Sequence, residues 1–495
     1  MKYDFLVIGA GVSGITCAIT LAQNGRRVAL LEKARLTAPL LRGFSRRQVR
    51  FDTGFHYAGG LGVGEPLEVF LRYLGVSDRI TSFPFDQDGF DLLRCQSPGF
   101  EFRMPIGYAR LRDSLCSAFP GERAAIDGYL AKVRAASASL PYLNLDAEAV
   151  ADSALQRVLG ATLRETLDAL TGNALLKSVL SAHCLLYGVS SDQVSFAQHA
   201  AIVGSYYGSV RGIRGGGLSL ARAFDDRLAE LGVDVLCQSE VTGIEVAPGG
   251  ALAGVRLAEG DTLAADQIIA TVHPKALLEM APLETFRPAY RKRLGALEDT
   301  VSAFLCFAVS KGPIPSLAGA NRFLLPDASC LQDLGRRPVG DAPLYLSAAY
   351  RQGELEPAGF IGISPLLFAG MAPWESSRTG RRPEQYRLFK EQALGRMRSQ
   401  IERAYPDLAG EIASIEGSTP LTVRDFCGSF AGGLYGVKHM VGQYNPHPTT
   451  RIPGLLLAGQ AVVAPGVMGA VLSGLLACGA ALGHDLIKKE LKGCC

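Results

Sequence analysis

The first 32 residues constrain the fold more than any other part of the chain. Lys2 to Ile8 is an apolar run with β-branched residues, which predicts a buried strand. The glycine-rich sequence Gly9-Ala10-Gly11-Val12-Ser13-Gly14 follows directly, and a helical pattern then runs from Ile15 to Asn24. Arg27 to Leu31 predicts a second strand, which ends at Glu32. This order indicates a strand–helix–strand unit with a glycine turn at the start of its helix.

Each glycine of this turn is required for a different structural reason. Gly9 allows a tight turn out of the strand, Gly11 lets the backbone approach a pyrophosphate, and Gly14 allows close packing of helix on strand. The helix N-terminus presents free N–H groups and partial positive charge to phosphates. Glu32 lies 18 positions after Gly14, where an acidic residue can accept from ribose hydroxyls. An acid there favours FAD or NAD over NADP, and the position near the N-terminus favours FAD.

Length and composition indicate a globular protein with more than one core. The chain has 495 residues, 48% of them hydrophobic and 20% charged, so two or three lobes are expected. The formal net charge is +3 with acids and bases interspersed, which excludes the basic footprint of a nucleic-acid-binding protein. The eleven cysteines show no metal-binding spacing, so no metal site is expected and a reducing, cytoplasmic location is favoured. We expect no signal peptide, and peripheral membrane association stays open.

A second glycine-interrupted apolar segment lies near the other end of the chain. Leu455 to Gly483 carries no charged side chain and is long enough to cross a membrane. Pro465 and six glycines interrupt it, so we predict a buried strand, a glycine turn and a buried helix instead. The N-terminus of this helix can point at the same ligand as the first helix, near a flavin ring or its ribityl chain.

The intervening sequence alternates between two kinds of domain. A glycine turn, a helix and several short strands between 206 and 275 predict a return to the nucleotide-binding domain. The other segments carry helices rich in apolar residues, which suit either a thick core or a lipophilic substrate tunnel. In these segments we expect helices at Asp146 to Leu155 and Leu163 to Leu180. At the C-terminus we expect a frayed tail from Lys488 to Cys495. The predicted boundaries are 1–75, 206–275 and 426–495 for the FAD-binding domain with its tail, and 76–205 and 276–425 for the substrate domain.

Aromatic and glycine residues mingle in the segment from Phe51 to Gly62. This composition suits a backbone that lies against a flat ligand, because glycine permits close approach and positive φ. His56 and Tyr57 lie at its centre and are the candidate catalytic residues. A histidine is more often structural than catalytic, so both interpretations of His56 stay open.

These motifs together resemble the phytoene desaturase-type flavoproteins, specifically the carotenoid isomerase and retinol saturase branch. The matching segments are Asp4 to Glu32, Phe51 to Tyr57, Gly454 to Gln460, Pro465 to Ala470 and Ser473-Gly474, with a looser match at His199 and Arg214-Gly215-Gly216. Two positions depart from the family pattern. Ala38-Pro39 stands where the family has a Gly-Gly pair, and Gln460-Ala461 stands where it often has an aspartate, and both changes touch contacts to the flavin diphosphate.

The resemblance implies an α/β fold and a cofactor. The fold is a Rossmann-type FAD-binding domain of the glutathione-reductase type with an interleaved α+β substrate domain. A returning strand in such a flavoprotein places Val241 near the adenine. The expected FAD contacts are Gly9, Gly11, Gly14, Glu32, Lys33, Val241, Gly459, Gln460, Val467 and Met468.

The implied activity is FAD-dependent oxidoreduction at carbon–carbon double bonds of a lipophilic polyene or isoprenoid, as a saturase, desaturase or isomerase. The electron donor or acceptor is unidentified. The sequence shows no Ser/His/Asp or Cys/His arrangement, which agrees with a cofactor that carries the reaction. Two alternatives stay open: an amine-oxidase-like flavoenzyme with a polar substrate, and a flavin-fold protein that binds lipid without turnover.

Overall fold

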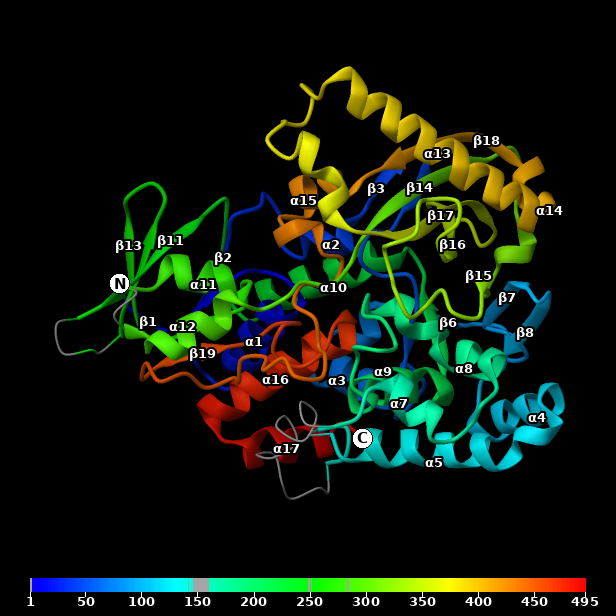
Figure 1. The fold of residues 1–495 in the computed structure, drawn as a ribbon. Helices are drawn as coiled ribbons and strands as arrows, with labels where there is room; N and C mark the ends of the chain where they lie inside the picture. The colour runs from blue at the N-terminus through cyan, green and yellow to red at the C-terminus, as the bar shows by residue number, and fades with distance from the viewer. Residues whose placement is uncertain (1, 141, 146–159, 248–249, 251, 283–284) are drawn as a thin grey trace.

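Two large β-sheets and one small sheet organise the chain (Figure 1). The structure is a computed structural model, which describes residues 2–140, 142–145, 160–247, 250, 252–282 and 285–495. Segments from both ends of the sequence contribute to the first sheet, and the second is built mainly from the middle of the chain.

The first sheet has the parallel order that a dinucleotide-binding unit requires. Strands β10 (Asp234–Cys237), β2 (Val28–Glu32), β1 (Lys2–Ile8) and β13 (Thr262–Ala270) are parallel neighbours in this order. The far edge of β13 pairs with two strands in succession, antiparallel with β12 (Leu252–Leu257) and parallel with β19 (Leu455–Leu457). Strand β11 (Val241–Val246) completes the sheet beside β12. Strands from three separate segments of the chain therefore share one sheet.

Helices α1 (Val12–Gln23) and α16 (Gly466–Leu482) pack side by side and run parallel (Figure 1). The Ser13 hydroxyl donates to the carbonyl of Ala470 at 2.7 Å, and the Cys17 thiol lies 3.6 Å from the carbonyl of Gly474. A step of four residues on one helix therefore matches a step of four on the other, in the same direction. A Cβ atom on Gly474 would lie only 2.8 Å from Cβ of Thr16. The absence of a side chain at this position thus allows the two backbones to approach.

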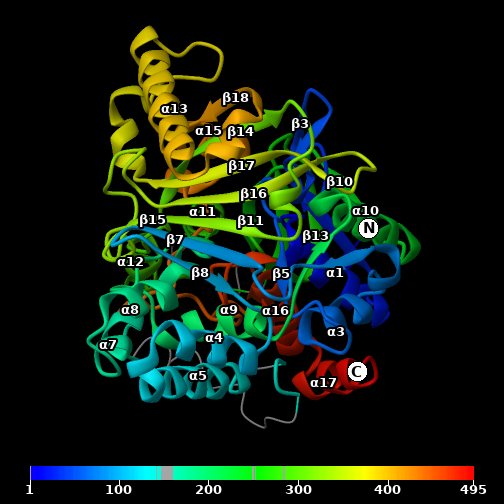
Figure 2. The ribbon, with the colours of Figure 1, turned by 90° about the vertical axis from the view of Figure 1, so that its right-hand side faces the viewer.

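The second large sheet has nine strands among the described residues and is built mainly from the middle of the chain. Its order is β18 (Ile412–Ser418), β14 (Ser302–Ser310), β17 (Pro357–Leu366), β16 (Leu344–Arg351), β15 (Asn321–Asp327), β7 (Asp91–Ser97) and β8 (Phe100–Met104), with β4 (Val49–Phe51) beside β16 and β3 (Phe44–Arg46) beside β4. Figure 2 shows helix α13 (Glu384–Ala404) on one side of this sheet and a group of helices on the other. That group comprises α4 (Tyr108–Ala118), α5 (Arg123–Ala138), α7 (Leu163–Asp168), α8 (Ala174–Ser181) and α9 (Phe196–Gly208).

A three-stranded sheet connects the two lobes. Strand β9 (Val210–Ile213) pairs with β5 (Ala58–Gly59) and with β6 (Ser82–Pro84). A Cβ atom on Gly59 would lie 2.5 Å from the backbone nitrogen of Tyr206, so β5 lies directly against helix α9. The remaining helices are α2 (Pro39–Arg42), α3 (Pro66–Tyr73), α10 (Gly216–Glu230), α11 (Pro274–Met280), α12 (Pro288–Gly295), α14 (Pro406–Gly410), α15 (Pro420–Cys427) and α17 (His484–Lys492).

Two predictions about helices were wrong, and one lies outside the described residues. The stretch from Leu163 to Leu180 forms two helices, α7 and α8, because the Asn173 side chain caps α8 by accepting from the N–H groups of Leu175 and Leu176. The tail is ordered as α17 instead of frayed, because that helix has an apolar face. The helix expected at Asp146 to Leu155 falls in the undescribed segment 146–159.

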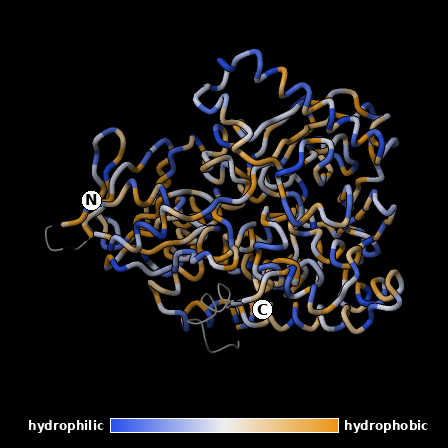
Figure 3. Tube along the Cα trace, in the orientation of Figure 1, coloured by the Kyte–Doolittle hydropathy of each residue, from blue (hydrophilic) through white to orange (hydrophobic). Residues whose placement is uncertain are grey.

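Hydrophobic residues concentrate in the interior of the trace, with hydrophilic residues on the outside (Figure 3). Among the described residues, no helix combines the length and the apolar character that a membrane crossing requires. The apolar run from Leu455 to Gly483 forms β19, a turn and α16, as predicted.

Helix α17 is expected to stabilise the fold, because Ile487 and Leu491 are fully buried against the FAD-binding domain. We predict that Leu491→Ala lowers the free energy of unfolding by about 3 kcal/mol, since it removes buried methyl groups and leaves a cavity. Leu486→Ala on the same helix is the matched control, because Leu486 is 38% exposed. Urea unfolding followed by circular dichroism measures both; equal effects of the two variants would show that α17 is not docked.

Candidate functional site

The glycine turn after β1 has the geometry that a bound diphosphate requires. Gly9 adopts a φ of +98°, and a Cβ atom there would lie 2.7 Å from the Thr271 hydroxyl oxygen. A Cβ atom on Gly14 would lie 1.9 Å from the carbonyl oxygen of Gly9, so this helix can approach the strand only with glycine. A Cβ atom on Gly11 would meet no protein atom within 4 Å. The space at Gly11 therefore fits a ligand group at the N-terminus of α1.

Glu32 lies at the end of β2 and connects the strand to the glycine turn. Its carboxylate accepts from the backbone N–H of Ala10 at 2.8 Å and from that of Ala34 at 2.8 Å. A carboxylate has about four acceptor positions, so two hydrogen bonds leave capacity for a ribose hydroxyl. Lys33 follows with an exposed side chain.

Val241 begins β11 close to the same corner of the sheet. Two residues earlier, the N–H of Ser239 donates to the carbonyl of Glu32 at 2.9 Å. The side chain of Val241 is buried in the hydrophobic cluster that contains Ala29 and Leu31. The structure therefore brings Val241 near Glu32, and contact of Val241 with the adenine stays a prediction.

The second set of expected FAD contacts lies between β19 and α16. Gly459 adopts a φ of +115° and donates its N–H to the Ser473 hydroxyl at 2.9 Å. The carbonyl of Gln460 accepts from Nε2 of His439 at 2.6 Å. Val467 and Met468 lie in the first turn of α16, whose N-terminus has no capping side chain. Because α1 and α16 run parallel and side by side, their N-termini lie at the same end of the helix pair.

The residue that replaces the family glycine keeps a glycine-like backbone. Ala38 adopts a φ of +44° in the left-handed region, which costs about 1–2 kcal/mol for a residue with a Cβ atom. Its N–H donates to the carbonyl of Ala10 at 2.7 Å, so the loop still contacts the glycine turn. Ala38 therefore keeps this loop in contact with the glycine turn despite its Cβ atom.

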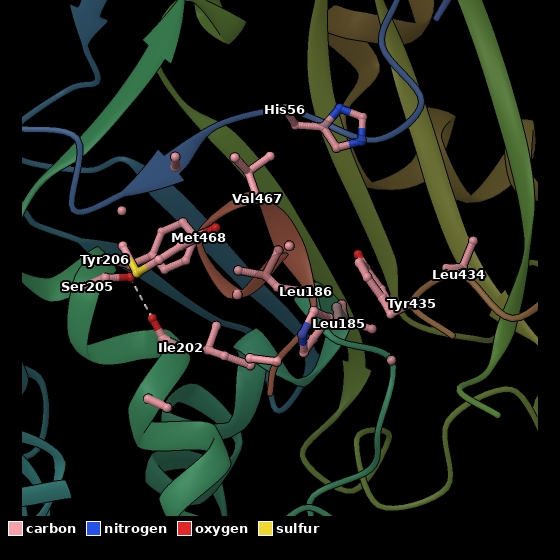
Figure 4. A pocket seen from close by; sticks show the side chains of 18 of the residues that line it. His56, Leu185, Leu186, Ile202, Ser205, Tyr206, Leu434, Tyr435, Val467 and Met468 are labelled. Atoms are coloured by element: carbon pink, nitrogen blue, oxygen red, sulfur yellow. Dashed lines mark hydrogen bonds between the residues drawn. The ribbon is translucent and has the colours of Figure 1, made fainter. Parts of the chain in front are cut away.

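A cavity begins at the N-terminus of α16 and extends to the second sheet (Figure 4). The segment 54–59, helix α9, strands β16 and β17 and the loop at 434–435 form its walls. Most lining side chains are aliphatic or aromatic, and no Asp, Glu, Lys or Arg from the described part of the chain lines it. Its polar lining groups are His56, Tyr57, Ser205, Tyr206, Tyr345 and Tyr435.

His56 lies in the wall of this cavity (Figure 4). Its ring lies 5.9 Å from the ring of Tyr345, measured between centroids, and it makes no hydrogen bond to another described residue. Removal from water disfavours the charged ring and lowers the pKa of His56 to about 4. The side chain is therefore a neutral imidazole at pH 7.

Tyr57 presents its ring to the cavity, and its hydroxyl binds elsewhere. That hydroxyl donates to the buried carboxylate of Asp91 at 3.0 Å. Asp91 also lies 2.8 Å from Nε2 of His183 and accepts from the Asn321 amide at 2.9 Å. The ring of Tyr57 therefore lines the cavity, and a buried polar network holds its hydroxyl in position. A catalytic role of Tyr57 stays a prediction.

Three further aromatic residues line the cavity and were not predicted from the sequence: Tyr206, Tyr345 and Tyr435. The signal for two of them was present, since Tyr206 lies in a Tyr-Tyr pair and Tyr435 in a glycine–aromatic loop. His199, part of the looser family match, is a buried structural residue. Its two ring nitrogens bind the hydroxyls of Tyr129 and Tyr187, both at 2.8 Å.

Comparison with known proteins decides the family. The model of the family described as flavin containing amine oxidoreductase matches residues 12–314, more than half of the chain. The chain belongs to this family. The turn at Gly9–Gly14 and the open space at Gly11 are in accord with a bound flavin dinucleotide. FAD is the cofactor, and the chain is an FAD-dependent oxidoreductase with the expected Rossmann-type fold.

This chain is similar over nearly its whole length to two kinds of curated protein. It is 25% identical to human all-trans-retinol 13,14-reductase, with 99% of this chain and 87% of the relative covered. It is 24% identical to the chloroplastic prolycopene isomerase of Arabidopsis thaliana, with 96% and 82% covered. The resemblance to the retinol saturase and carotenoid isomerase branch is confirmed.

Solved structures share the fold at lower identity. A putrescine oxidase triple mutant superposes with a TM-score of 0.67 at 15% identity over 99% of both chains. Cyclohexylamine oxidase from Brevibacterium oxydans superposes with a TM-score of 0.62 at 18% identity, over 99% of this chain and all of the other. These similarities establish the fold of this chain.

Gly11 and Gly14 are expected to respond differently to the same substitution. Gly11→Ala fits the φ of −72° and meets no protein atom, so we predict an unchanged free energy of unfolding and an FAD affinity lower by about tenfold or more. Gly14→Ala is expected to destabilise the apoprotein by about 1–3 kcal/mol, because its Cβ atom collides with the Gly9 carbonyl. Isothermal titration of the apoproteins with FAD, alongside urea unfolding, separates the effects; an unchanged FAD affinity of Gly11→Ala would contradict the assignment.

The low pKa of His56 predicts a loss of stability in acid. The unfolded ring titrates near pH 6.5 and the folded ring near 4, so between pH 7 and 5 protons bind preferentially to the unfolded chain. This contribution lowers the free energy of unfolding by about 2 kcal/mol. The chain has seven histidines, so the effect is measured as a difference from His56→Gln by urea unfolding at both pH values. Equal losses in parent and variant would show that His56 titrates normally.

Proposed function

We propose that this oxidoreductase acts on the carbon–carbon double bonds of a lipophilic polyene or isoprenoid. The observation that carries the proposal is the cavity at the N-terminus of α16, which is apolar in most of its lining and has no charged lining residue among the described residues. A conjugated hydrocarbon chain needs such a chamber, because burial of its apolar surface supplies most of the binding free energy.

The residues of this chain have three tasks in such a reaction. Bound FAD supplies hydride or electron transfer, which saturates, desaturates or isomerises a double bond. The glycine turn and the first turns of α1 and α16 would hold the cofactor, with Glu32 at its ribose. The aliphatic and aromatic walls exclude water and align the polyene. His56 is held neutral, so it offers one donor and one acceptor without placing a charge beside the polyene.

The relatives support this substrate class over the alternatives. The full-length relatives carry the names of a retinol reductase and a prolycopene isomerase. A polar amine as substrate is disfavoured, because an ammonium ion in this cavity would find no carboxylate among the described lining residues. A lipid carrier without turnover does not require the diphosphate geometry that Gly9, Gly11 and Gly14 retain.

The electron partner and the cellular site are part of the same proposal. A lipophilic substrate partitions into membranes, so we infer peripheral membrane association of a cytoplasmic protein. The electron donor or acceptor is a separate molecule of unassigned chemistry.

Anaerobic titration of the reduced holoprotein with a panel of polyenes tests the function. We expect one or more polyenes to reoxidise the flavin, with a product that differs by two hydrogens in mass, or to isomerise without net reoxidation. Benzylamine and putrescine added to the oxidised protein are the controls and are expected to leave the flavin oxidised. Flavin reduction by the amines, or polyene uptake without redox change or product in both the reduced and the oxidised protein, would contradict the proposal.

A further inference from the structure

Four tyrosines line the cavity, and their hydroxyl groups differ in environment. The Tyr57 hydroxyl is bound to Asp91. The Tyr345 hydroxyl oxygen is itself buried, and the nearby Asp91 carboxylate adds to burial in raising its pKa. The Tyr57 hydroxyl is therefore paired, and the Tyr345 hydroxyl is not accessible from the cavity. The rings of Tyr57 and Tyr345 lie stacked, with centroids 6.4 Å apart.

Tyr206 and Tyr435 have free hydroxyl groups that face the cavity. Tyr206 belongs to α9 and Tyr435 to the loop after Gly433, and Figure 4 shows them approaching from opposite sides. Neither hydroxyl makes a hydrogen bond to another residue in the described part of the chain. Burial raises the pKa of Tyr206, and the Asp91 carboxylate and then Tyr435 add to this effect, so Tyr206 and Tyr435 are electrostatic neighbours. Burial raises the pKa of Tyr435 to about 12, so both groups are protonated donors at pH 7.

We propose that Tyr206 and Tyr435 together hold an uncharged oxygen atom of the substrate, an alcohol or carbonyl group on an isoprenoid polyene. This inference rests on the proposed function and narrows its substrate class. It assigns Tyr206 and Tyr435 as specificity-determining residues, selecting against the matching hydrocarbon and the matching carboxylate.

The selection against a hydrocarbon follows from the cost of unpaired polar groups. A hydrocarbon that fills the cavity removes water from both phenols and returns no hydrogen bond. An alcohol oxygen can accept from one phenol and donate to the other, which satisfies both. Sites built to pair with a hydroxyl reject analogues that lack it for this reason.

The selection against a carboxylate follows from the absence of a cation. No Lys or Arg among the described residues lines the cavity, and His56 is neutral at pH 7. A carboxylate would exchange its hydration for two phenols at most, which does not compensate the desolvation of a full charge.

Equilibrium binding to the oxidised holoprotein tests the inference without turnover. The probes are all-trans-retinol, its hydrocarbon analogue with a terminal methyl group, and retinoic acid, at pH 7, followed by perturbation of the flavin absorbance. We expect the alcohol to bind about tenfold more tightly than the hydrocarbon, and the acid to bind most weakly. Tyr206→Phe and Tyr435→Phe should each reduce the alcohol-to-hydrocarbon ratio by about 3- to 10-fold.

Tyr345→Phe is the matched control, because its ring lines the same cavity and its hydroxyl is buried away from it. Its alcohol-to-hydrocarbon ratio should equal that of the parent. Equal affinity for retinol and retinoic acid, or an unchanged ratio in both the Tyr206 and Tyr435 variants, would overturn the inference and leave the proposed function intact. Failure of all three probes to bind the parent would instead overturn the proposed function, and the inference with it.

Discussion

The parallel contact between α1 and α16 is the interaction on which the rest of the structure depends. Parallel helices carry partial positive charge at adjacent N-termini, an arrangement that is unfavourable unless close packing and an anionic ligand compensate it. Small residues supply the packing: Ser13 and Cys17 on one helix meet Ala470 and Gly474 on the other. The result is one site with two helix N-termini, at which a single FAD molecule can contact both ends of the chain.

A second constraint is the neutrality of the cavity beside this site. Aromatic and aliphatic walls remove water, and the same removal of water lowers the pKa of His56 and raises that of Tyr435. Each shift acts in the direction that keeps the group uncharged. The chamber therefore offers hydrogen bonds without charge, which separates it from sites that bind ammonium or carboxylate groups. The buried network at Asp91 holds the Tyr57 wall in place without adding a charge to the lining.

The loop at Ala38 holds a residue with a Cβ atom in a conformation that favours glycine. A glycine there would adopt the left-handed conformation freely, whereas Ala38 adopts it at a cost in free energy. The hydrogen bond from Ala38 to Ala10 and the burial of the alanine offset that cost. Local strain next to a cofactor site is thus retained where the surrounding structure determines the path of the chain.

Local pattern in the sequence determined the elements that one stretch of chain can specify by itself. The strand, glycine turn and helix from Lys2 to Gln23, and the similar unit from Leu455 to Leu482, follow from apolar periodicity and from glycines at required positions. The prediction failed where a cap or an apolar face outweighed composition. Asn173 divides one expected helix into two, and the tail forms α17 because Ile487 and Leu491 find a core to pack against.

Only the tertiary structure decided which residues share the cavity and which way each polar group points. Tyr57, Tyr206, Tyr345 and Tyr435 come from four separate segments, so no spacing in the sequence relates them. Their hydroxyls are identical in the sequence, yet that of Tyr57 binds Asp91 and that of Tyr345 is buried, whereas those of Tyr206 and Tyr435 face the cavity. Local periodicity can specify an element, whereas long-range packing is needed to make a site from several of them.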